Sequence, residues 1–185
     1  MNSYTEVDEY GTKLWFNENG ERHRLDGPAV EWADGTKLWY QNGKLHRLDG
    51  PAVEYADGYK SWYQNGERHR LDGPAIECAD GDKKWYQNGK LHRQDGPAVE
   101  RTNGTKSWWV NGDRHRLDGP AVESSNGDKV WYQNGKLHRL DGPAVEWPDG
   151  AKEWWIEGEW WIEGEEYTEE KFLAKIEIMK RPCIG

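Results

Sequence analysis

The segment His46 to Glu54, HRLDGPAVE, returns along the chain at a constant interval. All six histidines of the protein belong to copies of this segment, and each lies 23 residues after the one before it. They are His23, His46, His69, His92, His115 and His138. A fixed period of this length is typical of repeat proteins, in which one copy is too small to bury a core and must stack on its neighbours. The sequence therefore predicts one array of tandem repeats.

The composition is acidic and rich in tryptophan. Charged residues make up 32% of the chain, yet it also contains 13 Trp and 9 Tyr, and disordered chains lack such aromatic residues. The net charge of -9 argues against direct binding to a nucleic-acid backbone, which requires clustered Lys and Arg. We find no signal peptide and no stretch with the length of a transmembrane helix, so we expect a cytoplasmic protein, in the host cytoplasm if a phage encodes it.

Two turn signals alternate within each repeat. Asn42-Gly43 and its equivalents are the strongest short hairpin signal, because both central residues of a type I′ turn need positive φ. Ala33-Asp34-Gly35 suits a three-residue loop with Gly in the left-handed region. Two turns predict two antiparallel strands per repeat, a short one at 36–41 and a long one at 44–55. Pairing through the turns places Glu31 opposite Lys37.

The longer strand is expected to bend, because Pro51 lies within it and has no amide hydrogen for a ladder. We interpret the constant residues around the bend as structural. Asp49 is expected to accept backbone hydrogen bonds across the bend, while His46 packs on Trp39 and Arg47 helps to hold the bend. The equivalent aspartates are Asp26, Asp49, Asp72, Asp95, Asp118 and Asp141.

The regular pattern is expected to end after Gly150, where WWIEGE occurs twice in tandem at 154–165. Residues 1–166 form the predicted array of about 6.5 repeats, and 167–185 the predicted capping helix and tail. Thr168 suits an N-cap and Pro182 a stop. The predicted fold is thus all-β, an elongated array of 23-residue antiparallel β-hairpin repeats closed by a short C-terminal α-helix.

The segments NGKLHR and ADGTKLWYQNG resemble the MORN repeat, which has the same length and a similar order of Gly, His, Asp-Gly, Tyr, Trp and Asn-Gly. The chain is still more similar to the HRxDGPA-type hairpin repeats of bacteriophages, large viruses and bacteria. This resemblance covers residues 7 to about 166. It implies a β-hairpin array that is used for binding, and it brings no catalytic residue.

We predict no catalytic residue, cofactor or metal site. Two strands per repeat place successive histidines about 10 Å apart, whereas ligands of one zinc ion each lie about 2 Å from it. The sequence also lacks a P-loop, a nucleophile elbow and a dinucleotide fingerprint. Six equal clusters do not form the one asymmetric pocket that catalysis needs, so we expect a protein that is not an enzyme.

The residue after the constant Glu differs between copies, and Trp or Tyr at such positions can anchor an interface. The preferred hypothesis is a scaffold that binds a protein, as a phage- or virus-type factor that inhibits a host defence protein. Two alternatives are a module that binds carbohydrate or another small ligand through aromatic rows, and an acidic mimic of nucleic acid. The predicted partner-binding residues are Trp32, Tyr55, Arg101, Trp147, Trp154, Trp155, Trp160 and Trp161.

Overall fold

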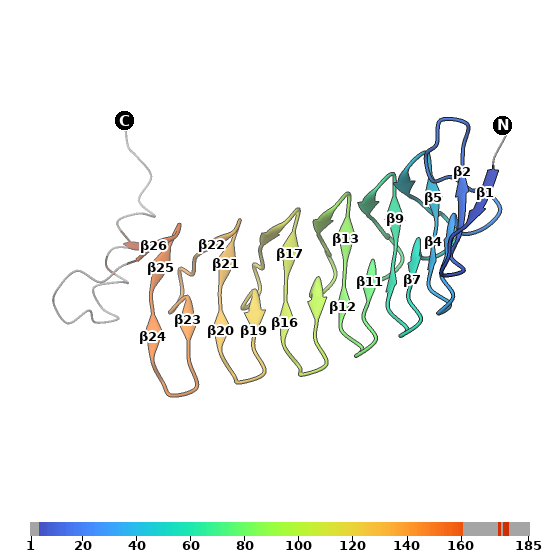
Figure 1. Cartoon of the computed structure of the whole chain (residues 1–185). Helices are drawn as coiled ribbons and strands as arrows, with labels where there is room; N and C mark the ends of the chain where they lie inside the picture. The colour runs from blue at the N-terminus through green and yellow to red at the C-terminus, as the bar shows by residue number, and fades with distance from the viewer. Residues whose placement is uncertain (1–3, 161–173, 175, 178–185) are drawn as a thin grey trace, which may run out of the picture. The chain divides into compact units, whose positions relative to one another are not determined.

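The computed structural model describes residues 4–160, 174, 176 and 177. The chain divides into two units, Met1–Thr102 and Asn103–Gly185. Both units consist of antiparallel β-hairpins that recur about every 23 residues (Figure 1), which confirms the predicted all-β hairpin repeats.

The predicted capping helix is not seen, because most of residues 167–185 lie outside the described residues. Of the three that are described, Ile176 is buried against Ile156 and Trp154.

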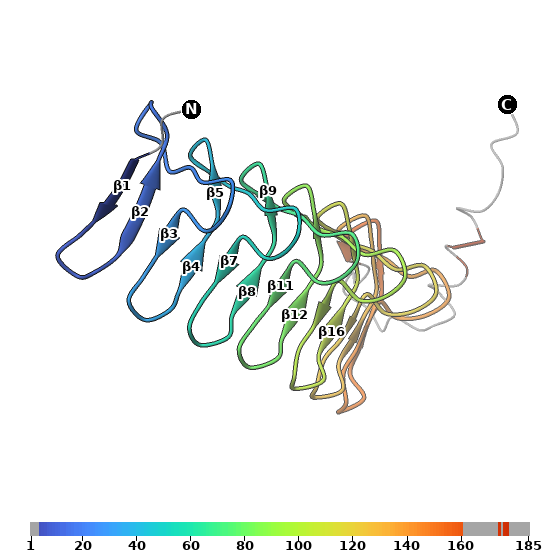
Figure 2. The same cartoon turned by 90° about the vertical axis from the view of Figure 1, so that its right-hand side faces the viewer.

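The main sheet of the first unit is a meander of short strands, and Figure 2 shows its hairpins side by side. Its strands, in spatial order, are β1 (Tyr4–Val7), β2 (Lys13–Phe16), β3 (Val30–Glu31), β4 (Lys37–Leu38), β7 (Val53–Glu54), β8 (Lys60–Ser61), β11 (Ile76–Glu77), β12 (Lys83–Lys84) and β15 (Val99–Glu100). The second unit continues the same pattern. Its main-sheet strands are β16 (Lys106–Ser107), β19 (Val122–Glu123), β20 (Lys129–Val130), β23 (Val145–Glu146) and β24 (Lys152–Glu153).

Each repeat also forms a second, separate hairpin around its Asn-Gly turn. In the first unit these hairpins are β5 (Tyr40–Gln41) with β6 (Lys44–Leu45), β9 (Tyr63–Gln64) with β10 (Glu67–Arg68), and β13 (Tyr86–Gln87) with β14 (Lys90–Leu91). In the second unit they are β17 (Trp109–Val110) with β18 (Asp113–Arg114), β21 (Tyr132–Gln133) with β22 (Lys136–Leu137), and β25 (Trp155–Ile156) with β26 (Glu159–Trp160).

The two strands predicted for each repeat are therefore divided into four. The predicted strand 36–41 is interrupted at Trp39, which donates its backbone N–H to Ala52 O at 2.8 Å and accepts from His46 N at 3.0 Å. Trp39 thus joins the main sheet to the second hairpin. The predicted strand 44–55 is interrupted by the bend, as expected from its proline.

The turns have the predicted geometry. Asn65 and Gly66 have φ angles of 53° and 87°, as a type I′ turn requires. In the other loop Trp32 N donates to Thr36 O, and Gly35 has a φ of 92°. This is the expected three-residue loop.

The regular pattern continues beyond Gly150, contrary to our expectation. The first WWIEGE copy forms β25 and β26, and Glu157 takes the place of the turn asparagine with a φ of 56°. Trp161, at the position of a seventh histidine, lies outside the described residues.

The core lies on one face of the main sheet. Val30, Leu38 and Val53 are buried there and pack against Tyr40 and Leu45 of the second hairpin. The opposite face carries a row in which Glu and Lys alternate, and Lys37 pairs in register with Glu31 on one side and with Glu54 of the next repeat on the other. The predicted pairing across the hairpin is confirmed, and the row extends it between repeats.

The left-handed turn glycines generate the first prediction. A Cβ on Gly66 would meet nothing closer than Lys44 Cβ at 3.7 Å, so a Gly66→Ala substitution is opposed by its φ of 87° and not by lack of space. We expect Gly66→Ala to lower the free energy of unfolding by about 1–2 kcal/mol in urea titrations. Asn65→Gly is the control and should change it by less, because glycine adopts this conformation freely. Equal losses in the two variants would contradict this explanation.

Candidate interaction surface

The most regular contact in the protein is an arginine placed over a tryptophan ring. The guanidinium carbon of Arg47 lies 4.1 Å from the centre of the Trp39 ring. Arg70 lies 4.0 Å from the Trp62 ring. The same contact, at 3.9 to 4.2 Å, is made by Arg24 on Trp15, Arg93 on Trp85, Arg116 on Trp108 and Arg139 on Trp131. One face of each of these indoles is therefore covered by a cation that the ring attracts.

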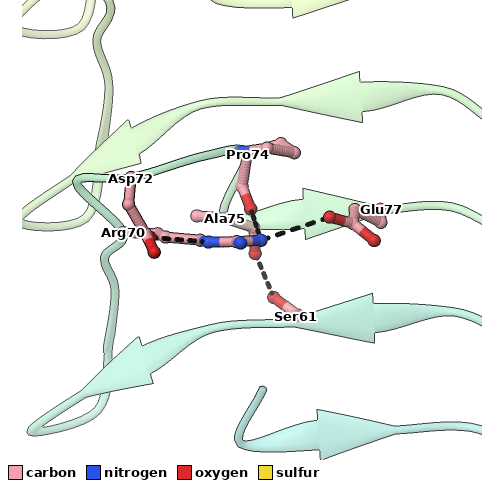
Figure 3. A network of polar contacts seen from close by, with 6 residues as sticks. All are labelled: Ser61, Arg70, Asp72, Pro74, Ala75 and Glu77. Atoms are coloured by element: carbon pink, nitrogen blue, oxygen red, sulfur yellow. Dashed lines mark hydrogen bonds and ion pairs between the residues drawn. The ribbon is translucent and has the colours of Figure 1, made fainter. Parts of the chain in front are cut away.

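The same guanidinium fixes the bend. Figure 3 shows Arg70, whose Nε donates to Asp72 Oδ1 at 2.9 Å and whose Nη1 donates to Pro74 O at 3.1 Å and to Glu77 Oε1 at 3.2 Å. Only about a fifth of the Arg70 side chain is exposed. The contacts of this one residue join the bend to the first strand of the following hairpin, β11.

The expected role of the bend aspartates needs a correction. We predicted that Asp72 would accept backbone hydrogen bonds across the bend, but the donor from across the bend is the Arg70 side chain, and 85% of the Asp72 side chain is exposed. The hydrogen bond and the charge of Arg70 lower the pKa of Asp72 below its usual value. The bend is thus held from inside by the arginine, and the aspartate lies on its outer surface.

The glycine of the bend makes room for the guanidinium. A Cβ on Gly73 would lie 2.8 Å from Arg70 Cζ, and on Gly50 it would lie 2.9 Å from Arg47 Cζ. These separations are shorter than van der Waals contact. Because the guanidinium is held by the indole and by three acceptors, it cannot move away without losing them, which explains why this position is glycine.

The histidines connect neighbouring repeats. His46 Nδ1 accepts a hydrogen bond of 3.1 Å from the backbone N–H of Asn65, which lies in the Asn-Gly turn of the next repeat. Gly66 N of the same turn donates to Leu45 O at 2.9 Å. The equivalent histidine bonds are His23 with Asn42, His69 with Asn88, His115 with Asn134 and His138 with Glu157. It is Arg47 that covers the Trp39 ring, while the His46 ring serves the next repeat.

Five of the six bends also expose a leucine. Leu48 is 75% exposed and Leu71 is 75% exposed, although they are the largest apolar side chains of their bends. Leu25 (72%), Leu117 (76%) and Leu140 (40%) are the equivalents, and Gln94 replaces leucine in the remaining copy. Sequence reasoning did not select these leucines. The sequence signal that could have identified them is an apolar residue that recurs in the repeat but is not assigned to the predicted core.

Hollows lie between successive bends. One of about 550 Å³ is bordered by the bends at Leu25 and Leu48 and lined by Trp39, Gln41 and His46. The next, of about 580 Å³, lies between the bends at Leu48 and Leu71. The second unit contains a hollow of about 480 Å³ between the bends at Leu117 and Leu140. The bends therefore form a repeated surface in which an exposed leucine and aspartate alternate with a hollow.

The predicted partner-binding residues lie elsewhere. Trp32 is 38% exposed, and Tyr55, which is 47% exposed, stacks on Tyr59 at 5.1 Å between ring centres. Arg101 is exposed. The remaining described positions, Trp147, Trp154 and Trp155, are half-buried, and Trp155 Nε1 donates to Glu153 Oε2 at 2.8 Å. The side chain of Trp160 and all of Trp161 lie outside the described residues.

No family model and no curated protein matches this chain. The resemblance to MORN and HRxDGPA-type repeats therefore stays a prediction. Within the described part of the chain, no helix could cross a membrane, and no three His, Cys, Asp or Glu side chains gather as metal ligands would.

A double-mutant cycle tests the fit between glycine and arginine. We expect Gly73→Ala to lower the free energy of unfolding by roughly 1–3 kcal/mol, because the new methyl group displaces the Arg70 guanidinium from its charged hydrogen bonds. In an Arg70→Ala background the same change should cost much less, because the obstructing group is gone. Urea titrations of the four proteins measure this coupling. A cost of Gly73→Ala that is the same in both backgrounds would contradict the model of shared space.

The bend aspartates predict an acid-dependent loss of stability. The arginine hydrogen bonds lower the folded-state pKa of Asp26, Asp49, Asp72 and Asp118 below the usual value of 3.8. An aspartate whose pKa is lowered on folding stabilises the protein at pH values above its usual pKa. This contribution is lost as the pH falls through the folded-state pKa. The melting temperature of a variant with all four residues changed to Asn should lie below that of the wild type at pH 7. The difference should shrink as the pH falls below about 3.8, and a constant difference from pH 7 to pH 2 would contradict the prediction.

Proposed function

We propose that this protein is a non-enzymatic repeat scaffold that binds another protein. It acts as a phage- or virus-type factor that occupies and inhibits a host defence protein. The scaffold is the array of hairpins joined by the Arg-Trp contacts and the His-Asn bonds. The resemblance to HRxDGPA-type repeats supports the viral source and the binding role.

One observation carries the proposal, namely the exposed leucine of the bend. The other constant residues of the bend are used by the fold: Arg70 covers Trp62, Gly73 makes room for it, and Pro74 O accepts from it. Leu71 is 75% exposed and belongs to no core cluster among the described residues. Exposed apolar surface mostly marks interaction sites where it is extended, and here leucines recur in three successive bends of the first unit with a hollow between neighbouring bends.

The carbohydrate alternative has less support. Sugar-binding aromatic rows need free ring faces, and the guanidinium of Arg47 already covers one face of Trp39 in the repeated site. The nucleic-acid mimic has less support as well, because lysines alternate with the glutamates along the main sheet, as at Lys37 between Glu31 and Glu54. A surface of mixed sign does not reproduce the uniform charge of a phosphate backbone.

The test starts from capture of host proteins on the immobilised full chain, followed by purification of the captured protein. The Kd of the captured protein is then measured for the wild type and for two double variants. The first is Leu48→Gln with Leu71→Gln, and the second is Trp32→Ala with Tyr55→Ala. Interface residues of this kind contribute about 2 kcal/mol or more when they are hot spots. We expect at least one of the two pairs to weaken binding by that amount while the melting temperature stays within a few degrees.

The control variants lie in the framework. Changing Lys60, in the Glu-Lys row of the main sheet, should leave the Kd unchanged. If neither double variant weakens binding and only a change of Lys60 or His69 does, the interface lies on the framework face. The assignment of the interface to the leucines or to Trp32 and Tyr55 then fails. Titration of oligosaccharides against tryptophan fluorescence provides the parallel test, and saturable quenching by a sugar would favour the carbohydrate alternative.

A further inference from the structure

The exposed leucines of the first unit are side chains that the fold itself does not require, and each is followed by an exposed aspartate. We call Leu25, Asp26, Leu48, Asp49, Leu71 and Asp72 the leucine–aspartate ridge. In the fourth bend of this unit Gln94 takes the place of leucine, and Arg93 still lies 4.1 Å from the Trp85 ring and bonds to Pro97 O. The bend therefore keeps these arginine contacts without a leucine. A side chain that packing does not need, yet that recurs in three successive bends, points to a ligand.

The spacing of the ridge matches one class of ligand. Each repeat adds two strands to the main sheet, so successive leucines are separated by about 10 Å. Seven residues of an α-helix rise about 10.5 Å, so apolar residues seven apart on a helix meet successive leucines in register. An extended peptide could match the distance too, but it gains its affinity from backbone hydrogen bonds to a sheet edge. The bends offer side chains, and a helix satisfies its own backbone groups.

The charge of the ridge specifies the helix further. The aspartate side chains are 85% exposed, whereas the arginines that bond to them, such as Arg47 and Arg70, are 23% and 21% exposed. The pKa of Asp49 is lowered by Arg47, which keeps the carboxylate ionised. The charge presented outward is therefore negative, and the complementary helix carries Lys or Arg beside its apolar residues.

The hollows provide depth for the apolar contacts. The space of about 550 Å³ between the bends at Leu25 and Leu48 has Trp39, Gln41 and His46 in its lining. The His46 Nδ1 atom lies 3.1 Å from the backbone nitrogen of Asn65 and 3.0 Å from its Oδ1 atom, so this nitrogen is occupied by the next turn. A partner side chain placed between two leucines meets both apolar atoms and polar groups there.

Resting on the proposed function, we infer that the leucine–aspartate ridge binds a basic amphipathic α-helix of a partner protein. Apolar residues spaced by seven lie against Leu25, Leu48 and Leu71, and Lys or Arg residues beside them face the aspartates. Three leucines in succession accommodate about three heptads. The run ends at Gln94, which removes the next apolar contact.

The experiment uses the full chain and two synthetic peptides of equal composition. The first is a three-heptad helix of Leu, Lys and Ala with leucines seven apart on one face, and the second has the same residues in an order that distributes the leucines around the helix. We expect the first peptide to bind, by isothermal titration calorimetry, at least about tenfold more tightly than the second. The triple variant Leu25→Gln, Leu48→Gln, Leu71→Gln copies Gln94 of the chain, so it should fold normally and should lose this preference.

A gain-of-function variant completes the test. Gln94→Leu extends the run of leucines in the first unit to four. It should raise the affinity for a four-heptad peptide by about threefold or more relative to the wild type. The affinity for the three-heptad peptide should change little. Equal binding of the two peptide orders would show that charge alone acts and would overturn the inference. The inference would also be overturned if the wild type associates with itself and the triple variant does not, because the ridge would then bind a second copy of this chain. If a captured host protein depends on the leucines while neither peptide binds, the helix inference fails and the proposed function stands.

Discussion

The guanidinium held over an indole is the contact on which each repeat depends. This contact explains four constant residues of the repeat. The tryptophan and the arginine after the histidine form it, the glycine leaves space for the guanidinium, and the proline carbonyl accepts a hydrogen bond from it. Lysine could not replace this arginine, because a single ammonium group cannot stack flat on a ring while donating to a carboxylate on one side and a carbonyl on the other. Most strands of the main sheet are only two residues long, and Arg47 and Arg70 join their bends to two of these strands through Glu54 and Glu77.

Local sequence signals were sufficient for the hairpins. The Asn-Gly turn places Tyr40 opposite Leu45. The three-residue loop places Glu31 opposite Lys37, as predicted. These features depend on residues within a few positions of one another. The interruption at Trp39 could not be predicted in this way, because it arises when the backbone N–H of Trp39 bonds to Ala52 in the next repeat. The role of His46 was missed for the same reason, since its partner is 19 residues away.

The candidate surface was harder to predict than the fold. In the sequence, recurrence indicates a requirement of stacking and variation indicates freedom to bind, which favours Trp32 and Tyr55 as partner-binding residues. A residue can recur because packing needs it or because it acts on the surface, and only its burial in the structure distinguishes these two causes. Ala52 recurs and is fully buried, whereas Leu48 recurs and is 75% exposed. The turn chemistry predicted that Asp49 accepts backbone hydrogen bonds across the bend, whereas its partner is the side chain of Arg47 and its carboxylate is 85% exposed.

The histidine bonds have a consequence for how such a chain can change its length. In the first unit, the turn amides of one repeat are satisfied by the histidine ring and the preceding carbonyl of the repeat before it, so the junctions formed by His23, His46 and His69 are chemically the same. A whole copy of 23 residues can be gained or lost without changing this chemistry, because the new junction is formed by groups already present. Insertion of a partial copy would leave a turn without its acceptors. The number of copies can therefore evolve stepwise, and with it the length of surface offered to a partner.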